Sequence, residues 1–588
     1  MQQVKDFMTR HRRWFIVLGY LAVLAAGVMF LRVTVNIPPE GDDKATLNGW
    51  MFQFEQTPFW QYALNELCTR LPRYLTLKEF RFFPFHYPWA VSLLFFGTMK
   101  SYRLYIIAIS AAAAFLVSRV AARVGRSDAL GLGMFALTLA LEPLWNECMF
   151  SYYAVPQKTM MWAAAGWLCL FYLQQSGHKR WAVAAAVLTF VSCGTYEVGY
   201  TLVVVAVILW LLYAGTLRGA LRGVWPVLCG GGVAFGFYFA TLRANRGAAY
   251  VGSTVGSDFA QAPRVLVQQM ASSIPFLNPM LRGEEYGTVT KGDLFWPLVL
   301  GLAAAVCLFF LAGRVQAAAL GKLAVAGLAL WAGPAAILAL SQRYQEPGVI
   351  DWKWGYIPAG TSSVGMTLLL AALLALLAGA CRRLPGWASV TARILLVLGV
   401  AAALCCNGAY IRAVLRTHHA ENLAKYAFFR DSVTAGLADE VETGDWIVCN
   451  ENVWAGSTGA ESSFFSRFAG RELHAVCAGA EAPPEDRDGE IFGYTTYRNY
   501  GSYDLAWCGR AQDPEATLLN GMRVYVQSSA VPDNAVLKYK VQAADGSMEE
   551  RAICLLDLDQ TPRDARGDYF VSVYDENIVN AKVMIWPG

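Results

Sequence analysis

Residues 10–35 read RHRRWFIVLGYLAVLAAGVMFLRVTV, an apolar run directly after a basic cluster. About 20 apolar residues are enough for an α-helix to cross the hydrocarbon of a bilayer. The run over residues 14–35 therefore predicts a membrane span, and the preceding Lys5, Arg10, Arg12 and Arg13 predict a cytoplasmic N-terminus. A secretory signal peptide begins similarly, but no small-residue cleavage site follows and the run is too long. We therefore expect a retained anchor.

The composition extends this interpretation to most of the 588 residues. Hydrophobic residues make up 56% of the chain and charged residues only 16%, with a mean hydropathy of +0.36. A typical soluble domain is about half apolar and about a quarter charged, so an ordinary cytosolic enzyme is excluded. The 13% of aromatic residues excludes disorder. The net charge of +4, with basic residues spread over short loops, argues against a nucleic-acid partner.

Ten further apolar runs follow the first, at residues 104–124, 129–145, 160–173, 181–195, 198–213, 225–242, 296–311, 322–340, 357–380 and 394–413. Every second gap between runs is basic, as the positive-inside rule requires. The residues concerned are Arg119, Arg123, Arg126, His178, Lys179, Arg180, Arg218, Arg222, Arg314, Lys322, Arg382 and Arg383. We therefore predict a mostly α, polytopic membrane helix bundle of about 11 spans whose C-terminal part lies outside the cytoplasm.

The predicted organisation has two domains, residues 1–416 in the membrane and residues 417–588 outside it. The first outer loop, residues 36–103, is long and aromatic, and its stretches 52–67 and 87–99 could lie in the membrane interface. After a helix at 418–437, strand-like runs separated by turn residues predict an extracytoplasmic α+β, β-rich domain. These runs are residues 445–449, 521–528, 535–541, 551–556 and 569–573.

Four of the 13 cysteines lie in this C-terminal part: Cys449, Cys477, Cys508 and Cys554. Four cysteines outside the cytoplasm suit one or two disulfides, whose connectivity the sequence leaves open. None has the CxxC spacing of a zinc site, so zinc is not expected.

The strongest local signal is PPEGDD at residues 38–43, directly after the first span. A carboxylate there, Asp42 or Asp43, could accept a proton from an acceptor hydroxyl at the membrane surface. Two adjacent carboxylates also repel each other, which raises the pKa of one of them. The structural alternative is a solvated turn, since Gly-Asp-Asp is ordinary turn sequence.

Later in the same loop, residues 81–88 read RFFPFHYP. Arg81 beside aromatic rings could hold a phosphate while the rings hold a lipid chain. The alternative is an interfacial aromatic belt with a snorkelling arginine, in which His86 is structural.

Three more outer segments carry candidate binding residues. Glu197, between two apolar runs, could bind a sugar hydroxyl or a divalent metal, and Lys158 could neutralise a phosphate; exposed loop positions are the alternative for both. Arg343 and Tyr344, with Asp351 and Lys353 shortly after, place charges among aromatic rings and suit a phosphate and a stacked sugar; an interfacial anchor is the alternative. All candidates are predicted on one side of the membrane.

These motifs together resemble the bacterial GT-C superfamily of membrane glycosyltransferases, which use polyprenyl-phosphate sugars. The resemblance rests on the early acidic pair, on RFFP at residues 81–84 and on the FFG…YRL lead into the next span at residues 95–104. It covers residues 14–415, and the C-terminal part adds nothing to it. The resemblance implies that Asp42 or Asp43, with Asp43 slightly favoured, is the catalytic base.

It further implies transfer of a sugar from a polyprenyl-phosphate donor to a cell-surface glycan or lipid acceptor, by a single inverting displacement. The expected location is the bacterial inner membrane. No cofactor is required by the sequence; Mg²⁺ or Mn²⁺ held by Asp43 and Glu197 is an option. We expect Asp43, Arg81 and the 343–353 segment to share one cavity at the outer surface.

Two alternatives remain. A transporter or flippase of lipid-linked glycans would also need many spans, but its polar groups lie near the bilayer midplane, where this sequence has almost no charges. A sensor with the C-terminal part as receptor needs only one or two spans.

Overall fold

The computed structural model describes residues 12–40, 42–78, 81, 99–145, 147–149, 154–245, 255–275, 277, 289–312, 315–350, 355–449, 458–479, 482–499, 503–528, 534–555 and 569–586. The chain forms two compact units. The helical unit comprises residues 1–37 and 63–419, and the sheet unit comprises residues 38–62 and 420–588. The first outer loop is thus shared between the two units.

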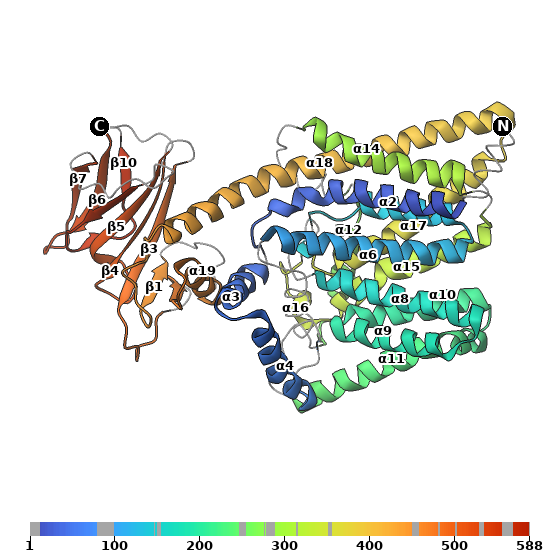
Figure 1. Ribbon diagram of the computed structural model, residues 1–588, viewed down its shortest axis with the longest axis horizontal. Helices are drawn as coiled ribbons and strands as arrows, with labels where there is room; N and C mark the ends of the chain where they lie inside the picture. The colour runs from blue at the N-terminus through green and yellow to red at the C-terminus, as the bar shows by residue number, and fades with distance from the viewer. Residues whose placement is uncertain are drawn as a thin grey trace. The chain divides into compact units, whose positions relative to one another are not determined.

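A helix lies at each of the eleven apolar runs (Figure 1). They are α2 (Arg12–Leu31), α6 (Met99–Gly125), α7 (Asp128–Ala140), α8 (Val155–Ser176), α9 (Lys179–Thr195), α10 (Val198–Ala214), α11 (Leu217–Ala244), α14 (Lys291–Val306), α15 (Ala317–Ala339), α17 (Ala359–Cys381) and α18 (Gly386–Thr434). Within the described residues, seven helices are long and apolar enough to cross a membrane, and α7 and α10 are shorter apolar helices. The predicted polytopic helical fold is confirmed.

Shorter elements connect these helices. They are η1 (Arg32–Asn36), α4 (Phe59–Leu75), η2 (Glu147–Met149), α12 (Ala262–Ser272), the π-helical segment η5 (Cys307–Leu311) and α16 (Gln342–Gln345). On α4, the exposed Trp60, Leu64, Leu71 and Leu75 recur at helical spacing on one face. An exposed apolar face of this kind suits a helix in the membrane interface. The stretch predicted to lie there, residues 52–67, covers the end of one helix (Asp42–Gln56) and the first half of α4, so its predicted bounds do not match a single helix. The second such stretch, 87–99, lies outside the described residues except for its last position.

Glycines set the closest approach between α15 and α17. A Cβ placed on Gly365 would lie 2.3 Å from the backbone N of Trp331, and one on Gly327 would lie 2.6 Å from the backbone N of Leu369. Because these neighbours are backbone atoms, they cannot rotate away. The two helices therefore pack at a separation that only glycine allows.

Replacing Gly365 by alanine is expected to destabilise the helical unit by about 1–3 kcal/mol, the usual cost of forcing an extra methyl group into a packed interior. Gly379→Ala on the same helix is the matched control, because a Cβ there meets no atom within 4 Å. Thermal unfolding in detergent should separate the two variants. Equal midpoints would show that the α15–α17 contact is not this close.

Helices that follow one another in the chain run in opposite directions, so the helical unit has two distinct ends. The hydroxyl of Ser192 near the end of α9 donates to the carbonyl of Thr159 at the start of α8 (2.8 Å). A Cβ on Gly333 of α15 would lie 3.1 Å from Cβ of Thr201 on α10. The end that carries residues 155–159, 192–201 and 333–345 is called the site end. The opposite end, with Arg382, is called the basic end.

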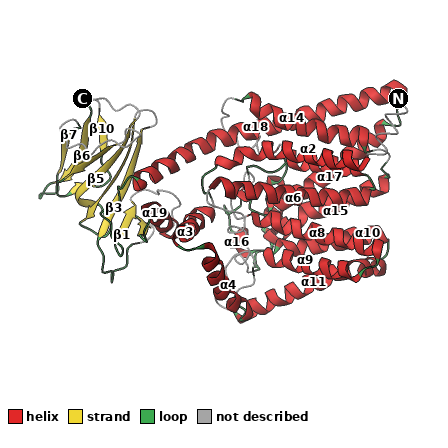
Figure 2. Ribbon diagram, viewed as in Figure 1, coloured by secondary structure: helices red, strands yellow, loops and turns green. Residues whose placement is uncertain are grey.

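In the part of the sheet unit that the structure describes, ten strands form one sheet with helix α19 (Thr458–Ala469) against one side (Figure 2). The strands are β1 (Trp446–Cys449), β2 (His474–Cys477), β3 (Ile491–Asn499), β4 (Tyr503–Ala511), β5 (Leu518–Ser528), β6 (Val536–Gln542), β7 (Met548–Cys554), β8 (Tyr569–Val573), β9 (Ile578–Val579) and β10 (Met584–Trp586). Their order is β10-β6-β9-β5-β4-β3-β1-β2, with β7 beside β6 and β8 beside β5. Among these ten described strands, β1 pairs in parallel with β2 and β3, and the other pairings are antiparallel.

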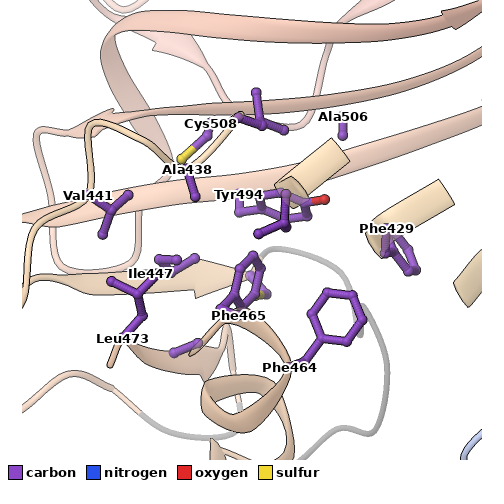
Figure 3. Packing of buried hydrophobic residues seen from close by; sticks show 14 of the residues in the cluster. Phe429, Ala438, Val441, Ile447, Phe464, Phe465, Leu473, Tyr494, Ala506 and Cys508 are labelled. Carbon is purple, nitrogen blue, oxygen red and sulfur yellow. The ribbon is translucent and has the colours of Figure 1, made fainter. Parts of the chain in front are cut away.

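The core of the sheet unit holds large aromatic side chains from helices and strands. Phe465 of α19 packs against Tyr494 of β3, Phe464 packs against Phe465, and Phe429 lies nearby, all nearly inaccessible to solvent (Figure 3). Burying one such side chain contributes roughly 1.5–3 kcal/mol. The five strands predicted from sequence are confirmed as β1, β5, β6, β7 and β8.

The predicted helix at 418–437 is the last part of α18, which continues without a break from the eleventh apolar run to Thr434. Residues 409–434 contain neither glycine nor proline, so nothing in the sequence interrupts the helix. It ends just before Gly436, whose φ of +103° suits a helix C-terminus.

Candidate functional site

Asp42 and Asp43 form the first turn of α3 (Asp42–Gln56) in the sheet unit. Asp43 is fully buried, and its backbone N–H donates to the carbonyl of Glu40 (3.2 Å). Carboxylates in the first helical turn are stabilised in their charged form by the helix dipole. Both residues are thus part of a helix, and the burial of Asp43 contradicts the solvated turn that was the structural alternative for it.

A buried side chain on α3, Asn48, links this helix to two others. Its Oδ1 accepts hydrogen bonds from the hydroxyl of Tyr426 (3.1 Å) on α18 and from Nη1 of Arg467 (2.9 Å) on α19. A second link lies nearer the acidic pair, where Nδ2 of Asn422 donates to the Glu40 carboxylate (3.1 Å). Two helices far away in the sequence therefore hold the helix that carries Asp42 and Asp43.

Asn48→Ala is expected to destabilise the sheet unit by about 2–3 kcal/mol, because it removes an acceptor from a buried hydroxyl and from an arginine. Gln53→Ala is the control, since Gln53 lies on the same helix with an exposed side chain. Chemical denaturation, followed by tryptophan fluorescence, measures the difference. Equal stability of the two variants would contradict the anchoring role of Asn48.

In the helical unit, the structure brings together two of the predicted residues, Arg81 and Glu197. Both Nε and Nη2 of Arg81 lie 2.8 Å from Oε1 of Glu197. The guanidinium also lies 5.7 Å from the centre of the Tyr196 ring. The hydroxyl of Tyr74 donates to the Arg81 carbonyl (2.8 Å). Glu197 therefore orients Arg81 and offsets its charge, a pairing across 116 positions that the sequence did not reveal.

Lys158 is the most unusual of the predicted residues. It lies at the start of α8 with only 4% of its surface exposed, and among the described residues Nζ has no hydrogen-bond partner. The Lys158 charge has a cation–π contact with the face of the Tyr105 ring on α6, whose centre lies 5.1 Å from Nζ. A buried ammonium without an acceptor is costly unless an anion binds to it. The exposed-loop alternative is therefore wrong for Lys158.

Lys158 and the Arg81–Glu197 pair lie at the same end of the helical unit. Lys158 precedes Thr159, which accepts a hydrogen bond from Ser192, and Ser192 lies one helical turn before Tyr196 and Glu197. The site end of the bundle thus carries one buried ammonium and one arginine held by a carboxylate. This arrangement suits a ligand with a phosphate group.

A second polar group at this end was not predicted as a site. Glu142, after α7, is only 6% exposed and lines a cavity of about 10 Å³ with Gln157 of α8 and Thr361 of α17. Oε1 of Gln157 and the Thr361 hydroxyl have no partner within the described part of the chain. The cavity has room for about one water molecule. The sequence indicated this polar group only through the position of Glu142, a carboxylate at the end of an apolar run.

Of the remaining candidates, Arg343 and Tyr344 lie on α16 just after α15. Arg343 is exposed, whereas Tyr344 is buried and its ring packs against Tyr356, with 4.8 Å between ring centres. Tyr344 is therefore part of the core around α12 and not an open platform for a sugar. His86, Asp351 and Lys353 lie outside the described residues.

The structure also tests the metal suggested for Asp43 and Glu197. No group of three or more His, Cys, Asp or Glu side chains that could hold a metal occurs within the described residues. Glu197 is already bound to Arg81. These donors do not fit Mg²⁺ or Mn²⁺, which require several oxygen ligands, and no step below uses a metal.

All 13 cysteines are free thiols, so the disulfides suggested for the C-terminal part are absent from the structure. Three of the four, Cys449, Cys477 and Cys508, are buried. Burial raises the pKa of the Cys508 thiol to about 12. Cys449 and Cys508 behave as small apolar core residues, whereas the thiol of Cys477 donates to Oε1 of Glu461 (3.8 Å).

No protein-family model and no curated protein sequence matches the chain. Similar solved structures include ArnT from Cupriavidus metallidurans in the apo state, which is 14% identical with a TM-score of 0.37 over 82% of this chain and 93% of ArnT. They also include the arabinosyltransferase EmbB from Mycobacterium smegmatis, 14% identical with a TM-score of 0.30. That match covers 97% of this chain, which spans 62% of EmbB. Likenesses at this level do not establish the function of this chain.

Proposed function

We propose that the protein is a membrane glycosyltransferase that moves a sugar from a polyprenyl-phosphate donor to a glycan or lipid acceptor. In this proposal, the N-terminus faces the cytoplasm of a bacterial inner membrane. The site end and the sheet unit face the opposite side. Nucleotide sugars are confined to the cytoplasm, so a transferase facing outward needs a donor carried by a lipid.

The observation that carries the proposal is the buried Lys158 ammonium at the end of an apolar helix bundle. Among the residues that the structure describes, Nζ has no hydrogen-bond partner and contacts the Tyr105 ring. A phosphate on an isoprenoid chain matches this chemistry, because its charge would pair with Lys158 while its chain lies against apolar helices. Arg81, oriented by Glu197, would supply a second cation.

The acidic pair supplies the proton acceptor in the proposed reaction. Asp42 or Asp43 takes the proton from the acceptor hydroxyl as that oxygen attacks the anomeric carbon. The bond from this carbon to the donor phosphate breaks, and the bond electrons leave on the phosphate oxygen. Lys158 and Arg81 stabilise that growing charge. A single displacement inverts the anomeric centre.

A transporter or flippase of lipid-linked glycans is the second candidate, and one observation favours it. Glu142 is a buried carboxylate within a helix bundle, and ionisable groups in such places commonly mark transport pathways. The two candidates differ in the fate of the donor. A flippase moves it intact, whereas a transferase splits it.

The decisive experiment uses the purified full-length protein in liposomes with a radiolabelled polyprenyl-phosphate sugar and membrane-extracted glycan. The proposal predicts release of polyprenyl phosphate together with label in the glycan. Movement of intact donor between leaflets, without release, would support the flippase and contradict the transferase. Protein-free liposomes provide the background for both measurements.

A further inference from the structure

The basic end of the helical unit contains a cavity of about 500 Å³ between α15, α17 and the π-helical segment η5. This volume is within the usual range of ligand pockets, about 300–1,000 Å³. Small residues, among them Ala317, Ala375 and Gly379, line much of it. Further from the basic end, α15 and α17 are in close contact at Gly327 and Gly365. The cavity therefore lies between the turns of the two helices that are nearest the basic end.

Two arginines, Arg382 and Arg383, are part of the cavity lining where α17 ends. Nη2 of Arg382 donates to the carbonyl of Phe309 in η5 (3.3 Å), which fixes this side chain beside the cavity, whereas Arg383 is exposed. No carboxylate is present among the described lining residues. The cavity thus combines apolar walls with two positive charges.

A third arginine adds to the positive charge near η5. The guanidinium of Arg393 on α18 lies 4.7 Å from the centre of the Phe310 ring. Positive groups between helices at one membrane face attract anionic lipid headgroups. A small soluble anion would gain from the arginines alone and would leave the apolar walls unused.

We propose that this cavity binds an anionic phospholipid, with an acyl chain in the apolar slot and the phosphate at Arg382 and Arg383. Guanidinium groups bind phosphate oxygens through paired hydrogen bonds, which suits this headgroup. The inference is independent of the proposed sugar transfer, because the cavity lies at the opposite end of the helical unit from Lys158. The bound lipid would fill the gap between α15 and α17.

The test measures lipid binding to the detergent-purified full-length protein by native mass spectrometry, with phosphatidylglycerol and phosphatidylcholine as probes. We expect phosphatidylglycerol to be retained preferentially. Arg382→Gln with Arg383→Gln should weaken its retention about thirtyfold, since each of the two charges contributes about 1 kcal/mol, a factor of about five. Arg180→Gln is the matched control, because Arg180 lies at the same end, packed on Trp181, and does not line the cavity.

A second variant keeps both arginines and fills the slot. A Cβ on Gly379 meets no atom within 4 Å, so Gly379→Leu should fold and displace the acyl chain. Gly321→Leu is its control, since Gly321 is equally open and lies outside the cavity lining. We expect phosphatidylglycerol to be lost from Gly379→Leu and retained by Gly321→Leu.

Several results would overturn the proposal. The first is equal retention of phosphatidylglycerol and phosphatidylcholine by the wild-type protein. The second is a loss of phosphatidylglycerol from Arg180→Gln as large as the loss from the Arg382→Gln, Arg383→Gln variant. The third is full retention of phosphatidylglycerol by Gly379→Leu. Thermal stabilisation by inorganic phosphate that equals the stabilisation by phosphatidylglycerol would also contradict a lipid ligand.

Discussion

Replacing both Asp42 and Asp43 by asparagine is expected to lower sugar transfer by about 10²–10⁴-fold, the usual contribution of a general base. Asparagine keeps the shape of the side chain and its capacity to accept a hydrogen bond, but it cannot take a proton. The assay measures transfer from a polyprenyl-phosphate sugar by the purified protein. The single variants then identify the base, because only one of them should lose most of the activity.

The control for this pair is Glu55→Gln on the same helix. The Glu55 side chain is 55% exposed, and its carboxylate lies 3.6 Å from Arg467. It should retain full transfer, because an exposed ion pair contributes little to stability. Undiminished transfer by the Asp42→Asn, Asp43→Asn double variant, with unchanged thermal unfolding, would show that the acidic pair has only a structural role.

The helical part of the fold was predictable because lipid imposes a strict rule on sequence. Each span must satisfy its backbone hydrogen bonds internally and be apolar along its length. Every one of the eleven runs consequently became a helix. The packing of α3 against α19 was not predictable, because it joins residues about 400 positions apart, such as Asn48 and Arg467. No periodicity in either segment encodes that pairing.

The missed strands have a different cause. β3 reads IFGYTTYRN and β4 reads YDLAWCGRA, in which polar and small residues break the alternation that identifies a strand. Such segments become strands because they pair with neighbouring strands in the folded sheet, and their local sequence alone does not predict this. Among the candidate site residues, Arg81 and Glu197 were predicted separately, as ligands of a phosphate and of a sugar or metal. Their mutual ion pair required the fold to be known.

Lys158→Met is expected to reduce sugar transfer at least about 100-fold, a typical loss when one group that stabilises developing charge is removed. The same variant should raise the stability of the ligand-free protein by about 1–2 kcal/mol, because an apolar side chain of similar length replaces a desolvated charge. The two measurements are transfer activity and thermal unfolding in detergent. Lys179→Met, an exposed lysine at the basic end, should change neither.

Opposite changes in stability and activity are characteristic of a residue kept for function. If the role of Lys158 were only to stabilise the fold, Lys158→Met would lose the stabilising contact between Lys158 and Tyr105. The variant would then unfold at a lower temperature than the wild-type protein. If its partner is the donor phosphate, adding the donor should stabilise the wild-type protein and leave Lys158→Met unaffected. Retained transfer in Lys158→Met would remove this residue from the donor site. The stability of the ligand-free variant therefore separates a structural lysine from a binding lysine, independently of the identity of the sugar.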